Sequence, residues 1–330
     1  MVRLITFDDI TETLLKIKQR GILFFLSKFN FDGKSRTISA FNKSSIISSN
    51  WWNIEMVKKR WNKKISGNYD INFVEFLMKK IIKEKSKIKM ISLGSGKCNY
   101  EFDFMKYNNI SEILCLDISE FRINGAIERA KKIDKNNKLQ FIVKDVKDYN
   151  LKENYFDLVL FNNSLHHFKN IDYLLNKNVF KSLRKGGIVV INEYVGPNRL
   201  QFPKDQIIKI NEALNLVPVK YKKRFNSKMI KSKFYGSGIL RMIVADPSEC
   251  IESETILSNI HKKFYPIIEQ PIGGNILMNV LKDISHNFIP LDDEKKKILE
   301  KLFDFEDKYL EQNTSDFIFG VYKKLDDPLS

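Results

Sequence analysis

The sequence predicts an α/β fold whose core is a mostly parallel β-sheet. Between about residue 70 and residue 195, stretches with helical periodicity alternate with short, nearly continuous apolar runs. This alternation is typical of βαβ units, whose strands are buried on both faces. A glycine-rich or acidic segment follows each of the first three apolar runs, at the edge where open α/β sheets bind their ligands.

The core is expected to begin with a helix over residues 73–83, because apolar residues recur there at helical spacing. Five buried strands are predicted after it: Lys89–Leu93, Glu112–Leu116, Leu139–Lys144, Phe156–Phe161 and Gly187–Asn192. Gly186 and Gly187 indicate the turn into the fifth strand, since paired glycines favour turns.

The part before the core, residues 1–69, is predicted to be a helical extension. A helix over Asp8–Phe29 is indicated by apolar residues at helical spacing: Ile10, Leu14, Leu15, Ile17 and Ile22. A polar connector, Asp32–Asn50, leads to a tryptophan-rich and basic segment, residues 51–62. Because Ser66 and Gly67 suit a hinge, this segment is expected either to pack in the core or to close over a bound ligand as a lid.

The part after the core begins with a long basic and aromatic stretch, residues 196–252. It leaves the fifth strand at the ligand-binding edge, so we expect an inserted cap that binds the substrate. An α/β pattern then returns over residues 253–330. Helices are predicted over 253–263, 273–284 and 292–311, and strands over 265–270 and 315–322. We thus expect four parts: 1–69, 70–195, 196–252 and 253–330.

Composition excludes several classes of protein. An apolar content of 43% argues against disorder. A mean hydropathy of -0.30, with no apolar run near the roughly 18 residues of a membrane span, predicts a cytoplasmic protein. The three cysteines, Cys98, Cys115 and Cys250, are widely separated, so neither a disulfide framework nor a metal site is expected.

The net charge of +16 is compatible with an anionic partner. Lysine greatly outnumbers arginine, however, and a coding bias produces the same excess. Proteins that read nucleic acids favour the planar fork of arginine. Nucleic acid is therefore not the favoured partner.

A glycine loop follows the first predicted strand directly, in Gly94, Ser95 and Gly96. Glycines at this spacing allow a sharp turn and a close approach of the backbone to a ligand. A little over 20 residues further, Asp117 ends the second strand, where a carboxylate can accept hydrogen bonds from ribose hydroxyls. The alternative role for Asp117 is a helix N-cap, for which Ser119 competes.

The third strand ends at another aspartate, Asp145. There it can meet an adenine amino group while Val146 packs on the ring. Its alternative is a turn or capping residue. The fourth strand ends in the polar segment Asn162-Asn163-Ser164-Leu165-His166-His167, so four signals fall in register along one edge of the sheet.

Together, residues 94–96, Asp117, Asp145, 157–167 and 183–187 resemble the class I S-adenosylmethionine-dependent methyltransferases. The resemblance covers about residues 70–195, and residues 264–323 look like the last two strands of that family. It implies a Rossmann-like sheet of seven mostly parallel strands with helices on both faces, and S-adenosylmethionine as the cofactor. The cofactor contacts that it implies are Gly94, Ser95, Gly96, Glu101, Asp117, Ile118, Asp145, Val146 and Asn162.

The sequence departs from the family pattern at two positions. Ser92 stands where an acidic residue usually ends the first strand, and Cys98 stands where a third glycine is common. The rival cofactor, NAD, requires a last glycine in its G-x-G-x-x-G motif, and Asn99 occupies that place. The glycine loop therefore favours S-adenosylmethionine.

Methyl transfer from a sulfonium requires in-line approach of a nucleophile, so positioning and exclusion of water supply most of the acceleration. If the acceptor is a hydroxyl, a base that removes its proton helps. The candidates are His166, His167 and Glu193. Each has an alternative role, because a histidine ring can pack beneath the loop and Glu193 can hold the following loop in place.

The cap, residues 196–252, carries cationic side chains between aromatic ones, which suits an anionic acceptor or a solvated surface: Lys220, Lys222, Lys223, Arg224, Lys228, Lys231 and Lys233. We expect a methyltransferase that acts on a small or conjugated metabolite at an oxygen or nitrogen atom. The alternatives are a methyltransferase of RNA or protein, and a binding or scaffold subunit that has lost activity.

Overall fold

The computed structural model describes residues 2–20, 49–134 and 136–325. The chain forms two compact units. The first contains residues 1–70, 196–250 and 271–317, and the second contains residues 71–195, 251–270 and 318–330. The segment predicted to complete the sheet, 253–330, is therefore shared between the units. Residues 21–48, which include part of the predicted first helix and most of the connector, lie outside the described residues.

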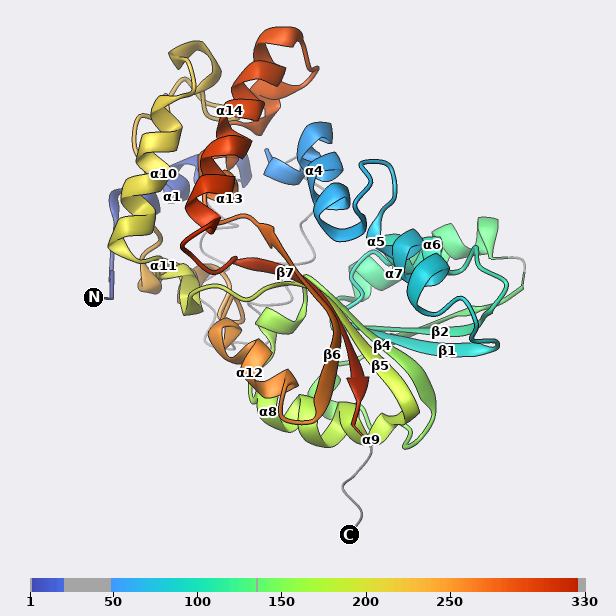
Figure 1. Cartoon of the computed structure of the whole chain (residues 1–330). Helices are drawn as coiled ribbons and strands as arrows, with labels where there is room; N and C mark the ends of the chain where they lie inside the picture. Colours follow the sequence, from blue (N-terminus) through green and yellow to red (C-terminus); the bar gives the residue numbers. More distant parts are fainter. Residues whose placement is uncertain (1, 21–48, 135, 326–330) are drawn as a thin grey trace. The chain divides into compact units, whose positions relative to one another are not determined.

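The second unit is built on a seven-stranded sheet with the strand order β3-β2-β1-β4-β5-β7-β6 (Figure 1). The strands are β1 (Ile88–Leu93), β2 (Ile110–Asp117), β3 (Leu139–Val143), β4 (Phe156–Asn162), β5 (Leu183–Tyr194), β6 (Phe264–Gly273) and β7 (Phe317–Lys324). All five predicted core strands and both predicted later strands are confirmed. The Rossmann-like fold predicted from the sequence is confirmed with them.

The first five strands pair in parallel, β1 with β2 and β4, β2 with β3, and β4 with β5. Their carboxyl ends therefore lie at one edge of the sheet. The order of the strands reverses between β1 and β4, and open α/β sheets bind ligands at such a switch point.

The fifth strand begins earlier than predicted, because the glycine pair forms an irregularity within β5 and not a turn before it. The pairing of β4 with β5 shifts register between Phe156 and Leu158. Gly186 has a φ of 68°, and a side chain at Gly187 would lie 2.9 Å from the carbonyl oxygen of Arg184. Glycine lets the strand continue through this irregularity.

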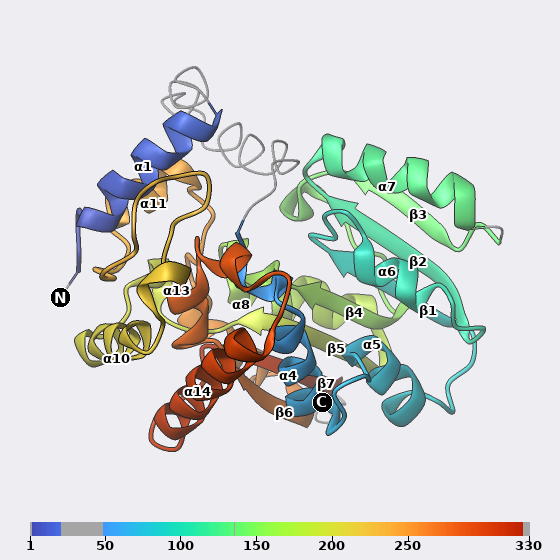
Figure 2. The ribbon, with the colours of Figure 1, turned by 90° about the horizontal axis from the view of Figure 1, so that it is seen from above.

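Helices cover both faces of this sheet, with α8, α9 and α12 on one side and α5, α6 and α7 on the other (Figure 1). Helix α7 runs beside β3 and β2 (Figure 2). The α-helices of this unit are α5 (Phe73–Phe76), α6 (Asn99–Phe104), α7 (Glu120–Ile133), α8 (Ile171–Tyr173), α9 (Phe180–Ser182) and α12 (Ile256–Ile260). Helix α5 continues as a π-helix over Leu77–Ile81, and α8 continues as a π-helix over Leu174–Val179. Short 3-10 turns lie at Val146–Asp148, Leu165–His167 and Ser253–Thr255.

The first unit is helical in its described part. Its helices are α1 (Phe7–Arg20), α4 (Glu55–Ser66), α10 (Lys204–Asn215), α11 (Ile239–Ala245), α13 (Leu277–Leu281) and α14 (Asp293–Leu310). Short 3-10 turns lie at Trp51–Asn53, Asn198–Leu200, Val219–Tyr221 and Ser285–Phe288. The helix predicted over 273–284 is shorter in the structure, because Gly273 and Gly274 have φ near 90° and cannot begin a helix.

Helix α1 differs from the prediction in the face that it buries. Asp9 is 5% exposed and accepts a 2.7 Å hydrogen bond from Nε of Arg241. The apolar residues Ile10 and Leu14 are 53% and 58% exposed. Ion pairs to a segment more than 200 residues away therefore fix this helix, and apolar periodicity could not reveal them.

The tryptophan-rich segment packs inside the first unit through Trp51, whereas Trp52 is 41% exposed. Trp51 is 2% exposed, and its ring meets that of Trp61 edge-on with 4.8 Å between the ring centroids. Phe317 contacts both rings. These rings form part of the apolar interior of this unit.

No helix of the described chain is long and apolar enough to cross a lipid bilayer.

Candidate functional site

The glycine loop leaves β1 in the conformation that the sequence required. Gly94 and Gly96 have φ of 73° and 58°, which favour glycine. The Gly94 amide donates a 2.8 Å hydrogen bond to the carbonyl oxygen of Leu116, which ties the loop to β2. A Cβ on Gly94 would lie 2.7 Å from Cβ of Ser164, so the missing side chain also lets the loop after β4 approach.

Asp117 holds this loop and is not the cap of α7. Its Oδ2 accepts a 2.8 Å hydrogen bond from the Gly96 amide, and its Oδ1 accepts a 2.7 Å hydrogen bond from the Ser119 amide. Ser119 is the N-cap, since its hydroxyl accepts from the Arg122 amide. Asp117 is 6% exposed, and Ile118, which follows it, is half-buried.

Asp145 caps a short 3-10 turn. Its Oδ1 accepts a 3.2 Å hydrogen bond from the Lys147 amide, and its Oδ2 lies 3.5 Å from Nζ of Lys147. Val146 is 4% exposed. The capping role that the sequence offered as an alternative is thus present, and it leaves Asp145 at the same edge as Asp117.

The first departure from the family pattern has a local compensation. Ser92 lies one residue before the end of β1 and has no carboxylate. Glu101 of α6 supplies one, since Oε1 of Glu101 accepts a 2.5 Å hydrogen bond from the Ser92 hydroxyl. Burial raises the pKa of Glu101 to about 7, against the effect of that hydrogen bond. A buried carboxyl therefore lies beside the end of the first strand.

The second departure concerns Cys98, at the position where a third glycine is common. Cys98 has a φ of 55° and precedes α6. The backbone thus keeps the left-handed conformation that glycine adopts easily, and the cysteine adopts it with strain. Cys98 is fully buried.

Glu193 organises the loop after β4. It is fully buried, and its Oε2 accepts hydrogen bonds of 2.8 Å and 2.7 Å from the amides of Ser164 and Leu165. Its Oε1 contacts Nδ1 of His166 and accepts from the Tyr194 amide. The loop-holding role of Glu193 is therefore present in the structure. The rings of His166 and His167 lie 4.2 Å apart between centroids.

Asn162 ends β4 and pairs with a residue that the sequence analysis missed. Asn162 and Asn192 are register partners, and Nδ2 of Asn192 donates a 2.9 Å hydrogen bond to Oδ1 of Asn162. The only signal in the sequence was a second asparagine at the end of a buried strand.

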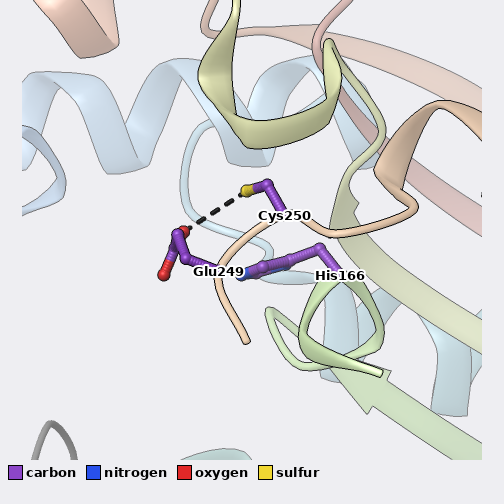
Figure 3. A group of neighbouring side chains, drawn as sticks. All are labelled: His166, Glu249 and Cys250. Carbon is purple, nitrogen blue, oxygen red and sulfur yellow. Dashed lines mark hydrogen bonds between the residues drawn. The ribbon is translucent and has the colours of Figure 1, made fainter. Parts of the chain in front are cut away.

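In the first unit, the thiol of Cys250 donates a 3.3 Å hydrogen bond to Oε1 of Glu249 (Figure 3). Figure 3 also draws His166 on the loop after β4. Cys250 is 1% exposed. This thiol lies in an interior position, as expected for a cysteine outside any disulfide.

Of the seven basic residues named in the predicted cap, three are buried: Lys222, Arg224 and Lys231. Lys231 is fully surrounded, and its Nζ donates to the carbonyl oxygens of Asn279 and Lys282. Arg224 pairs with Asp8 and Asp283, and Lys220 with Glu294. These contacts are structural, so the charge of this stretch is not a solvated surface throughout.

The residues of the ligand edge fit S-adenosylmethionine. The buried Oγ of Ser95 in the glycine loop has no hydrogen-bond partner in the described structure. A Cβ on Gly96 would meet one atom within 4 Å, a guanidinium nitrogen of Arg122 at 3.5 Å. The carboxyl groups of Asp117 and Glu101 lie at the same edge, next to the glycine loop and the end of β1. NAD fits less well, because Asn99 stands where its motif needs a glycine.

The strand order, the glycine loop after β1 and the acidic residue that ends β2 define a class I S-adenosylmethionine-dependent methyltransferase. The family model described as a methyltransferase domain matches residues 84–270, more than half of the chain. The chain therefore belongs to the methyltransferase-domain family.

Individual relatives share parts of the chain. It is 31% identical over 134 residues to the probable polyketide synthase 10 of Dictyostelium discoideum, and this match spans 36% of the chain and 5% of that protein. Two solved structures resemble it at low identity. Geranyl diphosphate C-methyltransferase of Streptomyces coelicolor has 10% identity, a TM-score of 0.49, and coverage of 76% of this chain and 75% of that one. Phosphoethanolamine N-methyltransferase 2 of Haemonchus contortus has 16% identity and a TM-score of 0.49, and the match covers 81% of this chain and 57% of that one.

Proposed function

We propose that the protein transfers the methyl group of S-adenosylmethionine to an oxygen or nitrogen atom of a small or conjugated metabolite, with His166 as the base. The observation that carries this proposal is the contact between the buried Glu193 carboxylate and Nδ1 of His166. A carboxylate at one nitrogen of an imidazole fixes the tautomer in which the other nitrogen accepts a proton.

The cofactor would lie along the edge formed by the ends of β1 to β4. The glycine loop, Gly94 to Gly96, is the proposed cradle for its amino acid part, with Ser95 Oγ as a hydrogen-bonding group. Asp117 and Ile118 would hold the ribose, and Asp145 and Val146 the adenine. Glu101 and Asn162 would face the methionine end. The order of these residues along the strands supports the assignment.

The bound cofactor supplies an electrophilic methyl group on a sulfonium. The residues of this chain have the remaining tasks, which are to align the acceptor with that methyl and to take its proton. Nε2 of His166 is the proposed proton acceptor. Glu193 orients the ring and stabilises the imidazolium that forms, and the hydrogen bonds that it accepts from the amides of Ser164, Leu165 and Tyr194 hold it in place. His167, whose ring is tilted against that of His166, is the second candidate base.

A metabolite is the favoured acceptor over RNA or protein. Arg224 and Lys231, which could have served an anionic polymer, are buried in internal contacts. The similarity to a segment of a probable polyketide synthase also supports a metabolite. If the acceptor is anionic, it would be bound by cationic residues other than Arg224 and Lys231.

The test is methyl transfer from S-adenosylmethionine labelled in its methyl group, offered to a panel of small phenols, alcohols and amines, with bulk RNA and a protein mixture as comparators. Label in a small molecule is expected. Label in RNA that declines steeply with rising salt would instead favour the nucleic-acid alternative. No binding of S-adenosylmethionine or S-adenosylhomocysteine would favour the scaffold alternative.

The base is tested with His166→Ala and His167→Ala on the acceptor found in that panel. We expect His166→Ala to lower kcat by 10²- to 10⁴-fold with little effect on affinity for S-adenosylhomocysteine. His261 is the matched control, because its Nε2 pairs with Glu269 at 2.8 Å on an exposed part of the same unit. Equal kcat in His166→Ala and His261→Ala would return His166 to a structural role.

A further inference from the structure

We propose that the side-chain oxygen of Asn192 accepts a hydrogen bond from an N–H or O–H group beside the transferred methyl, and so orients the methyl acceptor. This inference rests on the proposed function. Asn192 is 4% exposed, and its Nδ2 donates to Oδ1 of Asn162 over 2.9 Å. Its own Oδ1 is buried and has no hydrogen-bond partner in the described structure.

An unpaired carbonyl oxygen in the interior is costly, because it has lost water and gained no donor. Buried amide groups in folded proteins are nearly always paired. Asn192 also sits in a strand where apolar residues dominate, since Val190 and Ile191 precede it and are both fully buried. An apolar residue would serve the fold better, so the oxygen points to a ligand that supplies the donor.

The face of the sheet that bears Asn192 also bears Asn162 and Ser92. Side chains alternate along a strand. Leu93, Phe161 and Ile191 belong to the apolar cluster that packs under α8 and α12. Asn162 and Asn192 therefore point to the opposite face. Ser92 points there too, because it pairs with Leu160, two residues before Asn162, and Ser92 already bonds to Glu101 of α6.

The order of the strands places Asn192 beyond the cofactor. From β3 to β4, the edge presents Asp145, Asp117, the glycine loop and Asn162 in succession. These are the groups proposed for adenine, ribose and methionine, in that order. The next strand is β5, which holds Asn192 and pairs with β4. A group that reaches Asn192 therefore lies past the methionine end, where the methyl leaves.

The chemistry of the pair sets the class of ligand group. The amide nitrogen of Asn192 is committed to Asn162, so the position can only accept. The partner must be a hydroxyl, an amine or an amide N–H of the acceptor. Sinefungin offers such a group without knowledge of the acceptor, because it carries an amine where S-adenosylmethionine carries its methyl. S-adenosylhomocysteine carries nothing there.

The experiment compares Asn192→Val with the wild type by calorimetric titration of sinefungin and of S-adenosylhomocysteine. We expect sinefungin to bind at least tenfold more weakly to the variant, and S-adenosylhomocysteine to bind within about twofold of the wild type. Asn279→Val is the matched control, because Asn279 is also 4% exposed and also has an unpaired side-chain atom, in the first unit. It should leave both affinities unchanged.

Two outcomes would overturn the inference. If Asn192→Val binds both ligands equally more weakly, Asn192 contacts a group that the two ligands have in common. If neither affinity changes, Asn192 is a purely structural residue. Thermal unfolding of each variant checks the fold, and Asn192→Ala, which also lacks a hydrogen-bond acceptor, replaces Asn192→Val if the latter does not fold. Failure of the wild type to bind either ligand would contradict the proposed function itself, which separates the two failures.

Discussion

The hydroxyl of Ser92 donates a 2.5 Å hydrogen bond to Oε1 of Glu101, which joins the end of the first strand to helix α6. The carboxylate that the strand lacks thus comes from the helix. Burial raises the pKa of Glu101 to about 7, so this group changes charge within the usual range of assay conditions.

We expect the affinity for S-adenosylhomocysteine to rise about tenfold between about pH 6 and about pH 8. The ammonium group of the ligand would favour the ionised carboxylate, and ionisation is less costly as the pH rises through the pKa. Calorimetry at several pH values measures this. Glu101→Gln should remove the pH dependence, and Ser92→Ala should move it to higher pH, because the lost hydroxyl stabilised the anion. A flat profile in the wild type would remove Glu101 from the cofactor site.

Asp117→Ala should abolish binding of S-adenosylhomocysteine and also lower the free energy of unfolding by about 1–3 kcal/mol. The second effect follows because the amides of Gly96 and Ser119 lose their acceptor. Calorimetry and urea denaturation separate the two effects. Asp145→Ala is the comparison for the free energy of unfolding, because the Asp145 carboxylate accepts from the amide of Lys147 and is less buried than that of Asp117. Unchanged affinity in Asp117→Ala would contradict the ribose assignment.

Gly94→Ala should destabilise the second unit by about 2 kcal/mol or more. A left-handed conformation costs a residue with a Cβ about 1–2 kcal/mol, and the new Cβ would lie 2.7 Å from Cβ of Ser164. Urea denaturation of Gly94→Ala, Ser164→Gly and the double variant forms a cycle. The double variant should recover the steric part and not the conformational part. Purely additive effects would show that the two loops do not meet.

Asp316→Asn should make stability less dependent on pH. Burial raises the pKa of Asp316 to about 7, so the folded state holds this proton between about pH 4 and about pH 7 while the unfolded state releases it. The free energy of unfolding therefore falls as the pH rises through this window, by on the order of 2 to 4 kcal/mol from this group. Denaturation at several pH values measures the slope. The asparagine cannot ionise, so an equal slope of the free energy of unfolding against pH in both proteins would show that other groups cause the pH dependence.

The sheet and the cofactor edge could be predicted because their signals are local. Buried parallel strands appear as continuous apolar runs, and glycine or aspartate at their ends marks the ligand edge. Asp117 illustrates the limit of this reasoning. Its position was predictable, but its two backbone partners depend on how the loop after β1 turns.

Features that depend on distant partners escaped prediction. Asp9 is buried because Arg241 lies against it, and neither residue signals the other in the sequence. Asn192 gains meaning only through its register with Asn162, which requires the pairing of β4 with β5 to be known. Helix α10 lies in the basic and aromatic stretch 196–252, where charged residues weaken the apolar pattern that would indicate a helix.

The path of the chain between the two units limits how the protein can be dissected. The chain crosses between them after residues 70, 195, 250, 270 and 317. Any uninterrupted stretch of polypeptide that contains all of one unit also contains part of the other, so neither unit can be produced alone by a simple truncation. During synthesis, strands β6 and β7 are added to the sheet only after residues 196–250 have been made. A shortened recombinant fragment that stops at the end of β5 would expose the edge of that strand, and aggregation of such a fragment is the expected behaviour.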